Sequence, residues 1–173
     1  MIEWIVLDVK EDYYVIISKY ALDTIGYYNL EWKHNLDMLI WENSFLRKWL
    51  NEEFYQTAFS DTERNKIVEK RIITTENLNE SSYKNFVHIL SLEEVEKYFP
   101  AMEQRKVKPT AYAISKGART GWTSETKEYT SWWILPYIEM MGTMEGFFLE
   151  HINLKLNCKN MWCVMDFMTT IAL

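Results

Sequence analysis

Between residues 41 and 54 the apolar side chains recur with the 3.6-residue period of an α-helix. One broad face of this segment carries Phe45, Leu46, Trp49, Leu50 and Phe54. The other face carries Arg47, Lys48, Glu52 and Glu53. Asn43 or Ser44 can accept hydrogen bonds from the free amides at the start of such a segment. We therefore expect an amphipathic helix here that buries one of its faces.

Residues with high strand propensity gather near both ends of the chain. Two runs rich in β-branched and aromatic residues, 4–7 and 13–17, flank a short charged segment, which is typical of a β-hairpin. The last third has three more apolar runs, at 131–135, 145–152 and 162–173, which we interpret as strands. This order predicts an α+β fold for a single domain over residues 1–173, with the termini meeting in one mostly antiparallel sheet.

The middle of the chain carries the signals of short helices. Two pairs have the spacing of a capping box, Ser60 with Glu63 and Ser91 with Glu94. The second pair predicts a helix that ends near Pro100, and a further helix is expected at 109–114, with Gly117 as its terminator. Strands are predicted at 67–73 and 86–90.

Charge and composition exclude several classes of partner. The 173-residue chain has 19 Lys and Arg against 25 Asp and Glu, a formal net charge of −6. Its basic residues are scattered along the sequence, which disfavours binding to nucleic acid or to an anionic membrane by bulk positive charge. No run approaches the roughly 20 apolar residues that cross a bilayer, and no secretory segment opens the sequence. We therefore expect a soluble, cytoplasmic protein.

Common catalytic and cofactor motifs are missing from the sequence. It contains no G-x-x-x-x-G-K, G-x-G-x-x-G, G-x-S-x-G or H-E-x-x-H pattern. The three histidines, His34, His88 and His151, are far apart, and His88 fits a hydrogen-bonded core histidine better than a metal ligand. We expect no bound metal, no cofactor and no catalytic residue from these patterns.

The predicted helix also carries a longer motif. It reads Trp41-Glu42-Asn43-Ser44-x-Leu46-Arg47-x-Trp49-Leu50-Asn51, continuing to Phe54-Tyr55 and Ala58-Phe59-Ser60. This resembles a bacterial domain family of unknown function, whose members run W-E-x-S-x-L-R-x-W-L-N-x-x-F-Y and then A-F-S. Segments at 2–8, 17–23, 90–94, 109–113 and 132–133 keep the family's order, so the resemblance covers nearly the whole chain.

We interpret this motif as structural. The residues concerned are Trp41, Glu42, Ser44, Arg47, Trp49 and Asn51. An arginine at a helix start is expected to be tied to backbone carbonyls or to a nearby acid. The alternatives are a recognition pair of Arg47 with Glu42, and a ligand-stacking platform built from Trp41, Trp49, Trp132 and Trp133.

The family is similar to the C-type-lectin-like fold, in the branch shared by formylglycine-generating enzymes and the variable proteins of diversity-generating retroelements. The resemblance implies a twisted, mostly antiparallel sheet flanked by two main helices. It also implies chain ends that lie close together and a ligand-binding face within residues 120–165 or so.

The sequence departs from the family at three places. The family arginines of W-W-L-R-S-P-G and G-V-R-P-A are absent, because residues 132–137 read W-W-I-L-P-Y and residues 166–170 read D-F-M-T-T. The absence of both arginines favours apolar packing in place of an internal polar network. The start is shorter than usual for the family, which leaves a sheet edge either open or covered by a partner.

Aromatic and amide side chains gather in the predicted loops of the C-terminal half. They are Trp122, Tyr129, Tyr137, Asn153, Asn157, Asn160 and Trp162. Rings and amides on a rigid sheet suit adaptable recognition. We therefore predict a non-enzymatic domain that binds an unknown protein or small ligand through these loops. Ordinary loop chemistry with partly buried rings is the alternative.

Two further functions stay open. Cys158 and Cys163 have the C-x4-C spacing of the cysteine pair in formylglycine-generating enzymes, which would imply a copper-dependent oxidoreductase. Their position and flanking residues differ from that pair, and two reduced, incidental thiols are the simpler interpretation. The run Met140-Met141-Gly142-Thr143-Met144, with Phe147 and Phe148, would support a self-associating homo-oligomer if exposed, and would fill the core if buried.

Overall fold

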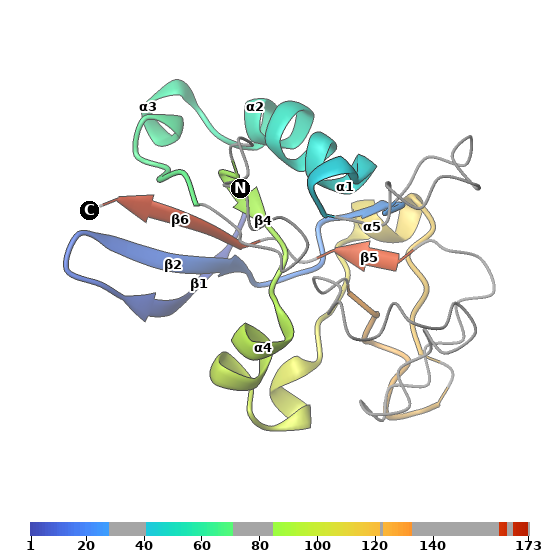
Figure 1. Cartoon of the computed structure of the whole chain (residues 1–173). Coiled ribbons are helices and arrows are strands. Elements are labelled where there is room, and N and C mark those ends of the chain that lie inside the picture. Colours follow the sequence, from blue (N-terminus) through green and yellow to red (C-terminus); the bar gives the residue numbers. More distant parts are fainter. Residues whose placement is uncertain (28–40, 71–84, 122, 133–162, 166–167, 173) are drawn as a thin grey trace.

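A four-stranded antiparallel sheet, in the order β1-β2-β6-β4, joins the two ends of the chain (Figure 1). The computed structural model describes residues 1–27, 41–70, 85–121, 123–132, 163–165 and 168–172. β1 (Trp4–Val9) and β2 (Tyr13–Ser18) form the predicted hairpin, β6 (Met168–Ala172) pairs with β2, and β4 (Val87–His88) pairs with β6. The predicted mixture of helices with an antiparallel sheet is confirmed.

The two terminal strands flank β2 but bring the chain ends to opposite ends of it. β1 and β6 are both antiparallel to β2, so they run parallel to each other. Trp4 pairs with Ser18 at one end of β2, and Ala172 pairs with Tyr13 at the other end. The close chain ends that the resemblance implied are therefore not found.

A second, two-stranded sheet lies beside the first. It pairs β3 (Asp23–Ile25) with β5 (Cys163–Met165) in an antiparallel arrangement. The single strand predicted over residues 162–173 is therefore wrong, because this segment supplies β5 to one sheet and β6 to the other. The last strands of the chain thus hold both sheets together.

The predicted amphipathic helix covers one face of the larger sheet. It consists of a 3₁₀ turn η3 (Trp41–Asn43), α1 (Phe45–Trp49), a π-helical turn η4 (Leu50–Phe54) and α2 (Tyr55–Ala58). Leu46 and Leu50 are 0% exposed, as the helical period predicts. Phe45 is 41% exposed instead of buried, because it lies at the first position of α1, beside the inward-facing residues and not among them. Arg47, predicted on the outer face, is half-buried.

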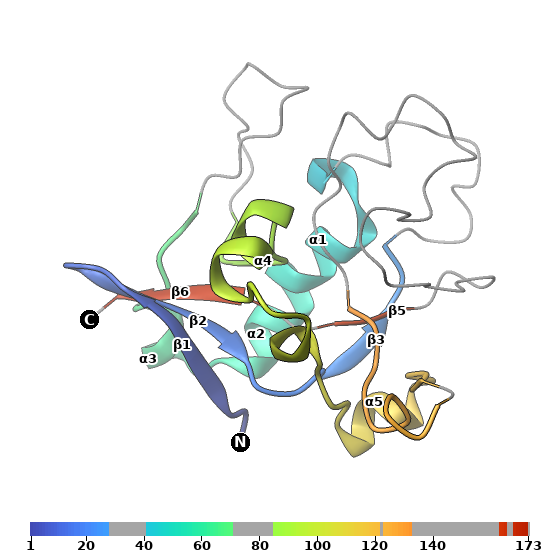
Figure 2. The same ribbon diagram turned by 90° about the horizontal axis from the view of Figure 1, so that it is seen from below.

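A second helical layer covers the opposite face of the sheet (Figures 1 and 2). α4 (Leu92–Tyr98) places Val95 in a cluster with Val15 and Ile17 of β2. The helix of residues 41–58 packs on the other side, in a cluster that includes Val87 of β4. Two cores therefore sandwich the sheet, and burial of apolar surface on both faces stabilises it.

The short helices lie close to their predicted positions, although the helix expected at 109–114 spans residues 111–115. Capping boxes at Ser60 and Ser91 start α3 (Asp61–Arg64) and α4. The chain then passes through the 3₁₀ turn η5 (Met102–Arg105) to α5 (Ala111–Ser115). Gly117 follows α5 with φ of +101°, a left-handed conformation that side chains with a Cβ rarely adopt.

Two predicted strands are missing or shortened among the described residues, and residues 71–73 of the first lie outside those residues. Residues 67–70 form no strand, and Lys70 is joined to Asn85 by an isolated antiparallel bridge. The strand predicted at 86–90 is reduced to the two residues of β4. Ser131 and Trp132 begin another predicted strand but lie outside any strand. In these segments apolar side chains pack on the core without a continuous neighbouring strand, so burial alone overpredicts sheet.

Across the part of the chain that the structure describes, no helix has both the length and the apolar character needed to cross a bilayer.

Candidate functional site

The motif of the long helix is directed into the protein. Asn85, 1% exposed, accepts hydrogen bonds at its Oδ1 from Trp41 Nε1 at 3.1 Å and from Arg47 Nε at 3.0 Å. Ser44 caps α1 by accepting from the backbone amide of Arg47 at 3.1 Å and itself donates to the Trp41 carbonyl at 2.9 Å. These contacts tie the helix start to the segment that leads into β4.

Asn51 joins the π-helical turn to the same segment. Its Oδ1 accepts from the backbone amides of Phe86 at 2.7 Å and Val87 at 3.1 Å. Its Nδ2 donates to the carbonyls of Val87 and Arg47, both at 2.9 Å. The Asn51 side chain thus forms hydrogen bonds with four backbone groups, a role that a neighbouring strand would have in a sheet. The polar side chains of Ser44, Arg47 and Asn51 thus hold the fold together. Trp49 packs on Phe54 with ring centroids 5.4 Å apart.

A different group of residues presents chemistry to the surface. The Nζ atoms of Lys106 and Lys108 each lie 5.7 Å from the centre of the Tyr129 ring, within the range of cation–π attraction. Lys108 also forms an ion pair with Glu128 at 2.7 Å, which raises the pKa of Lys108. We call Lys106, Lys108 and Tyr129 the lysine–tyrosine cluster.

Backbone hydrogen bonds position this cluster. Thr130 donates from its amide to the Val107 carbonyl at 3.0 Å, which places Tyr129 beside the segment that carries both lysines. The same segment is fixed to the end of β2, because the Ala21 amide donates to the Lys108 carbonyl at 3.0 Å. Val107, between the two lysines, is buried with Ala21 and Ala113. Alternation along this extended segment turns both lysines outward.

The turn before Tyr129 depends on a close approach at Gly121. The Gly121 amide donates to the carbonyls of Tyr129 at 3.0 Å and Thr126 at 3.2 Å. A Cβ at this position would lie 2.2 Å from Thr126 Oγ1 and 2.8 Å from the Thr126 carbonyl oxygen. Only glycine fits without displacing the turn.

Replacing Gly121 by alanine will therefore shift the 120–130 turn and lower the free energy of unfolding by about 1–3 kcal/mol. Urea denaturation of the two proteins measures the change. Ala118→Gly, in the preceding segment, introduces no atom and serves as a backbone-entropy control with a smaller effect. A Gly121→Ala protein as stable as the parent would contradict the close approach.

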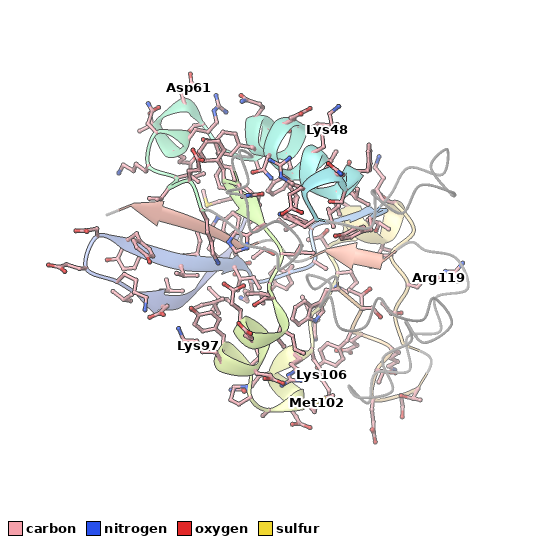
Figure 3. The ribbon with its side chains drawn as sticks, in the orientation of Figure 1. Lys48, Asp61, Lys97, Met102, Lys106 and Arg119 are labelled. Carbon is pink, nitrogen blue, oxygen red and sulfur yellow. The ribbon has the colours of Figure 1, made fainter. Side chains whose placement is uncertain are left out.

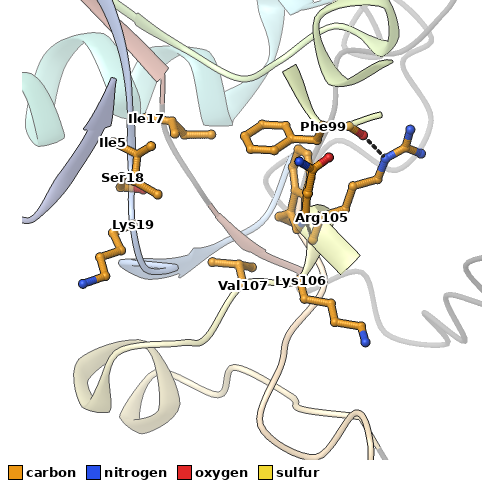
Figure 4. A pocket seen from close by; sticks show the side chains of 10 residues that line it. Ile5, Ile17, Ser18, Lys19, Phe99, Arg105, Lys106 and Val107 are labelled. Atoms are coloured by element: carbon orange, nitrogen blue, oxygen red, sulfur yellow. Dashed lines mark hydrogen bonds between the residues drawn. The ribbon is translucent and has the colours of Figure 1, made fainter. Parts of the chain in front are cut away.

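A shallow hollow of about 50 Å³ lies beside the lysine–tyrosine cluster. Its lining is contributed by Ile5, Ile17, Ser18, Lys19, Phe99, Gln104, Arg105, Lys106, Val107 and Trp132. Its apolar side chains come from Ile5, Ile17, Phe99, Val107 and Trp132. Figure 4 shows the charged ends of Lys19, Arg105 and Lys106 turned away from the hollow. The hollow is therefore lined mainly by apolar groups, with Ser18 and Gln104 as polar ones, and has cations at its rim.

The hollow's aromatic walls are held by specific contacts. Trp132 donates from Nε1 to the Arg105 carbonyl at 2.9 Å, and its ring meets that of Phe99 edge-on, with centroids 6.4 Å apart. Arg105 in turn donates from Nε to the Phe99 carbonyl at 2.7 Å. Phe99, Arg105 and Trp132 therefore fix one another, and the hollow is formed before any ligand arrives.

The rim cations differ in how they are neutralised. Lys19 forms an ion pair with Glu3 at 2.8 Å, and the pKa of Lys19 is raised as a result. Across the described ranges of the chain, no ion pair joins a carboxylate to Arg105 or Lys106. Neither cation therefore holds a described carboxylate that a ligand would have to displace, and their internal contacts include the Tyr129 ring and the Phe99 carbonyl.

The loop residues predicted as a binding site divide into two groups. Tyr129 is half-buried and lies in the lysine–tyrosine cluster. The other predicted site residues, Trp122, Tyr137, Asn153, Asn157, Asn160 and Trp162, lie outside the described residues. Also outside them are Trp133, Cys158, the methionine-rich run 140–144, Phe147 and Phe148, and Cys163 is described only as part of β5.

Sequence reasoning missed the cationic rim. The basic residues are scattered along the chain, yet the fold brings Lys19 to the same hollow as Arg105 and Lys106. One local signal was present, because Lys106-Val107-Lys108 alternates in the way that places two cations on one side of an extended segment. Nothing local indicated that Lys19 would join them.

In the described ranges, no group of three or more His, Cys, Asp or Glu side chains could hold a metal ion.

No curated protein and no solved structure matches the chain. The sequence profile of DUF6273, a domain of unknown function, matches residues 11–141. Since that is more than half of the 173 residues, the chain belongs to the DUF6273 family.

Proposed function

We propose that this protein is a non-enzymatic binding domain of C-type-lectin-like fold that recognises a polypeptide partner through loops of its C-terminal half. The fold is supported by helices on both faces of an antiparallel sheet that contains both terminal segments. The binding role is supported above all by the position of Tyr129, which lies between two lysines beside a preformed hollow.

The physical argument rests on preorganisation. An aromatic ring and a small apolar hollow offer area that a partner can cover, and neighbouring cations give that area a preferred electrostatic complement. Because backbone hydrogen bonds at Val107 and Gly121 already hold the segments on either side of the ring, little conformational entropy is lost on docking. Aromatic side chains in such settings often carry a large share of the binding energy.

Selection from a random peptide library against the purified full chain tests this proposal. We expect selected peptides to bind about tenfold more weakly to Tyr129→Ala, the loss typical of an aromatic hot spot. Tyr112→Ala is a matched control, because Tyr112 is exposed on α5 and has Lys116 Nζ 5.5 Å from its ring. The proposal would be contradicted if the selected peptides bound equally well to Tyr129→Ala, or if the library yielded no binder.

Self-association is a second candidate, favoured by the exposed edge of the sheet. Within the described residues β1 pairs only with β2, and its Ile5, Val6 and Val9 are 42%, 54% and 63% exposed. An apolar edge strand is a template for another strand. Light scattering at rising concentration should then show masses above 20.9 kDa, and Val6→Lys should suppress the increase. A constant 20.9 kDa would reject this candidate.

A further inference from the structure

We infer that the hollow binds one aliphatic side chain of an acidic peptide segment, while Arg105 and Lys106 bind carboxylates that flank this side chain. The inference rests on the proposed function and names the ligand class of the same face. It requires three properties of the site: a small, mainly apolar centre, a rigid wall and a rim with cations that form no ion pair with a described carboxylate.

The size of the hollow limits what can enter it. A volume of about 50 Å³ corresponds to about three to five water molecules, if each needs roughly 10–15 Å³. This is the size of the branched end of a valine or leucine side chain.

The lining of the hollow suits an aliphatic group. Ile17 and Val107, which are 4% and 6% exposed, line it together with Ile5, Phe99 and Trp132. Covering these surfaces with a methyl-bearing side chain removes apolar area from water. Because Trp132 and Phe99 are held by Arg105, the walls need no rearrangement before the side chain docks.

The rim determines the charge of the flanking residues. Arg105 and Lys106 are consecutive and make no ion pair with any described carboxylate, whereas Lys19 and Lys108 are paired with Glu3 and Glu128. Arg105 uses Nε for the Phe99 carbonyl and Nη1 for Met102 Sδ at 3.7 Å. Nη2 therefore remains to donate to an incoming carboxylate. The whole chain has a net charge of −6, so two neighbouring cations without a carboxylate partner are unlike its average composition.

An aliphatic group between carboxylates is a combination that acidic peptides provide. The apolar residue enters the hollow, and acidic residues on either side reach the rim. Electrostatic complementarity of this kind raises the association rate and opposes peptides of the wrong charge. The ligand class is therefore an acidic segment with one valine or leucine anchor.

Fluorescence anisotropy with labelled peptides tests the inference on the full chain. The probe is fluorescein-Gly-Asp-Asp-Leu-Asp-Asp-Gly-amide, and the comparison peptides replace Leu by Gly or all four Asp by Lys. We expect binding of the probe at low salt, and at least about tenfold weaker binding of both comparison peptides. Equal binding of either comparison peptide, or no binding of the probe, would overturn the inference.

Two charge reversals locate the binding site. Lys106→Glu should weaken the probe about tenfold or more, because it places a carboxylate at the rim. Lys48→Glu changes the net charge equally, but Lys48 is exposed on α1, far from Lys106 (Figure 3), and should leave the affinity within about twofold. Equal losses in both variants would mean that bulk charge is responsible, which also overturns the inference.

The outcome can be separated from that of the proposed function. If the random library yields peptides that depend on Tyr129 but carry no acidic and aliphatic pattern, the binding function stands and the assigned ligand class is wrong. If the acidic probe binds, and its binding depends on Lys106 and on the leucine of the probe, the binding function and the ligand class are both supported.

Ile5→Asp, which puts a carboxylate in the wall of the hollow, should weaken binding of the probe in a protein whose circular dichroism is unchanged.

Discussion

Replacing Asn51 by leucine is expected to lower the free energy of unfolding by about 3–5 kcal/mol, close to the limit for a single substitution. The side chain makes four hydrogen bonds to backbone groups of Arg47, Phe86 and Val87. Leucine has a similar volume but can serve none of them, so two amides and two carbonyls lose a partner in a partly or fully buried setting. Urea denaturation followed by circular dichroism measures the loss.

Two further variants sharpen this prediction. Asn51→Asp keeps an acceptor for the two amides and removes both donors, so its loss should lie between those of the parent and the leucine variant. Asn65→Leu makes the same chemical change at an exposed position, beside α3, and should alter the stability by less than about 0.5 kcal/mol. A loss below about 1 kcal/mol for Asn51→Leu would show that the helix does not depend on this side chain.

Acidification is expected to destabilise the protein through His88. This residue of β4 is 0% exposed, and its Nδ1 lies 3.0 Å from the Ile89 carbonyl oxygen. Burial, and then the positive charge of Lys70, lower the pKa of His88 to about 4. A histidine in the unfolded chain titrates near pH 6.5. Between pH 6.5 and pH 4, His88 is therefore protonated in the unfolded state but mostly neutral in the folded state. Stability is complete above about pH 6.5 and falls by about 3 kcal/mol toward pH 4.

Glu94 contributes in the same direction. Burial by itself would raise its pKa, but hydrogen bonds from Lys70 Nζ at 2.5 Å and from the Ser91 amide at 2.9 Å give a net lowering. A carboxyl group with a lowered pKa stabilises the fold at neutral pH, and this contribution is lost as the pH falls through its titration in the folded state. The two groups therefore act together in acid.

Urea denaturation at pH 7.5, 6.5, 5.5 and 4.5 measures this dependence. His88→Leu removes the titrating group from the core and should flatten the dependence of stability on pH between pH 6.5 and 4.5. The remaining pH dependence should come from Glu94. His88→Gln, which keeps a hydrogen-bonding group, serves if the leucine variant folds poorly. A slope that is the same with and without His88 would exclude this residue as the cause.

The helix of residues 41–58 shows how far periodicity predicts packing. The spacing of Leu46, Leu50 and Phe54 placed all three in the core correctly. It also placed Phe45 there, yet this ring is 41% exposed and is not among the residues that pack in the cluster with Val87 and Ile89. The period of the apolar residues predicts which side of the helix is buried. How many residues on that side are buried depends on the element that packs against the helix.

The candidate binding face was predicted less well than the fold. Tyr129 was selected for its aromatic ring in a loop, and it does lie at the surface cluster described above. The hollow was not predicted, because its walls come from the hairpin, the segment after α4 and Trp132. Apolar residues in three such segments carry no common local pattern before the chain has folded.

What the sequence determined by itself is local. The hairpin, the capping boxes at Ser60 and Ser91, and the glycine after α5 depend on residues a few positions apart, whose preferences act before distant contacts form. Only the tertiary structure decided that Asn51 would serve a segment 35 residues away and that Lys19 would share a rim with Lys106. Such contacts follow from how the helices pack on the two faces of the sheet, and that packing depends on the whole chain.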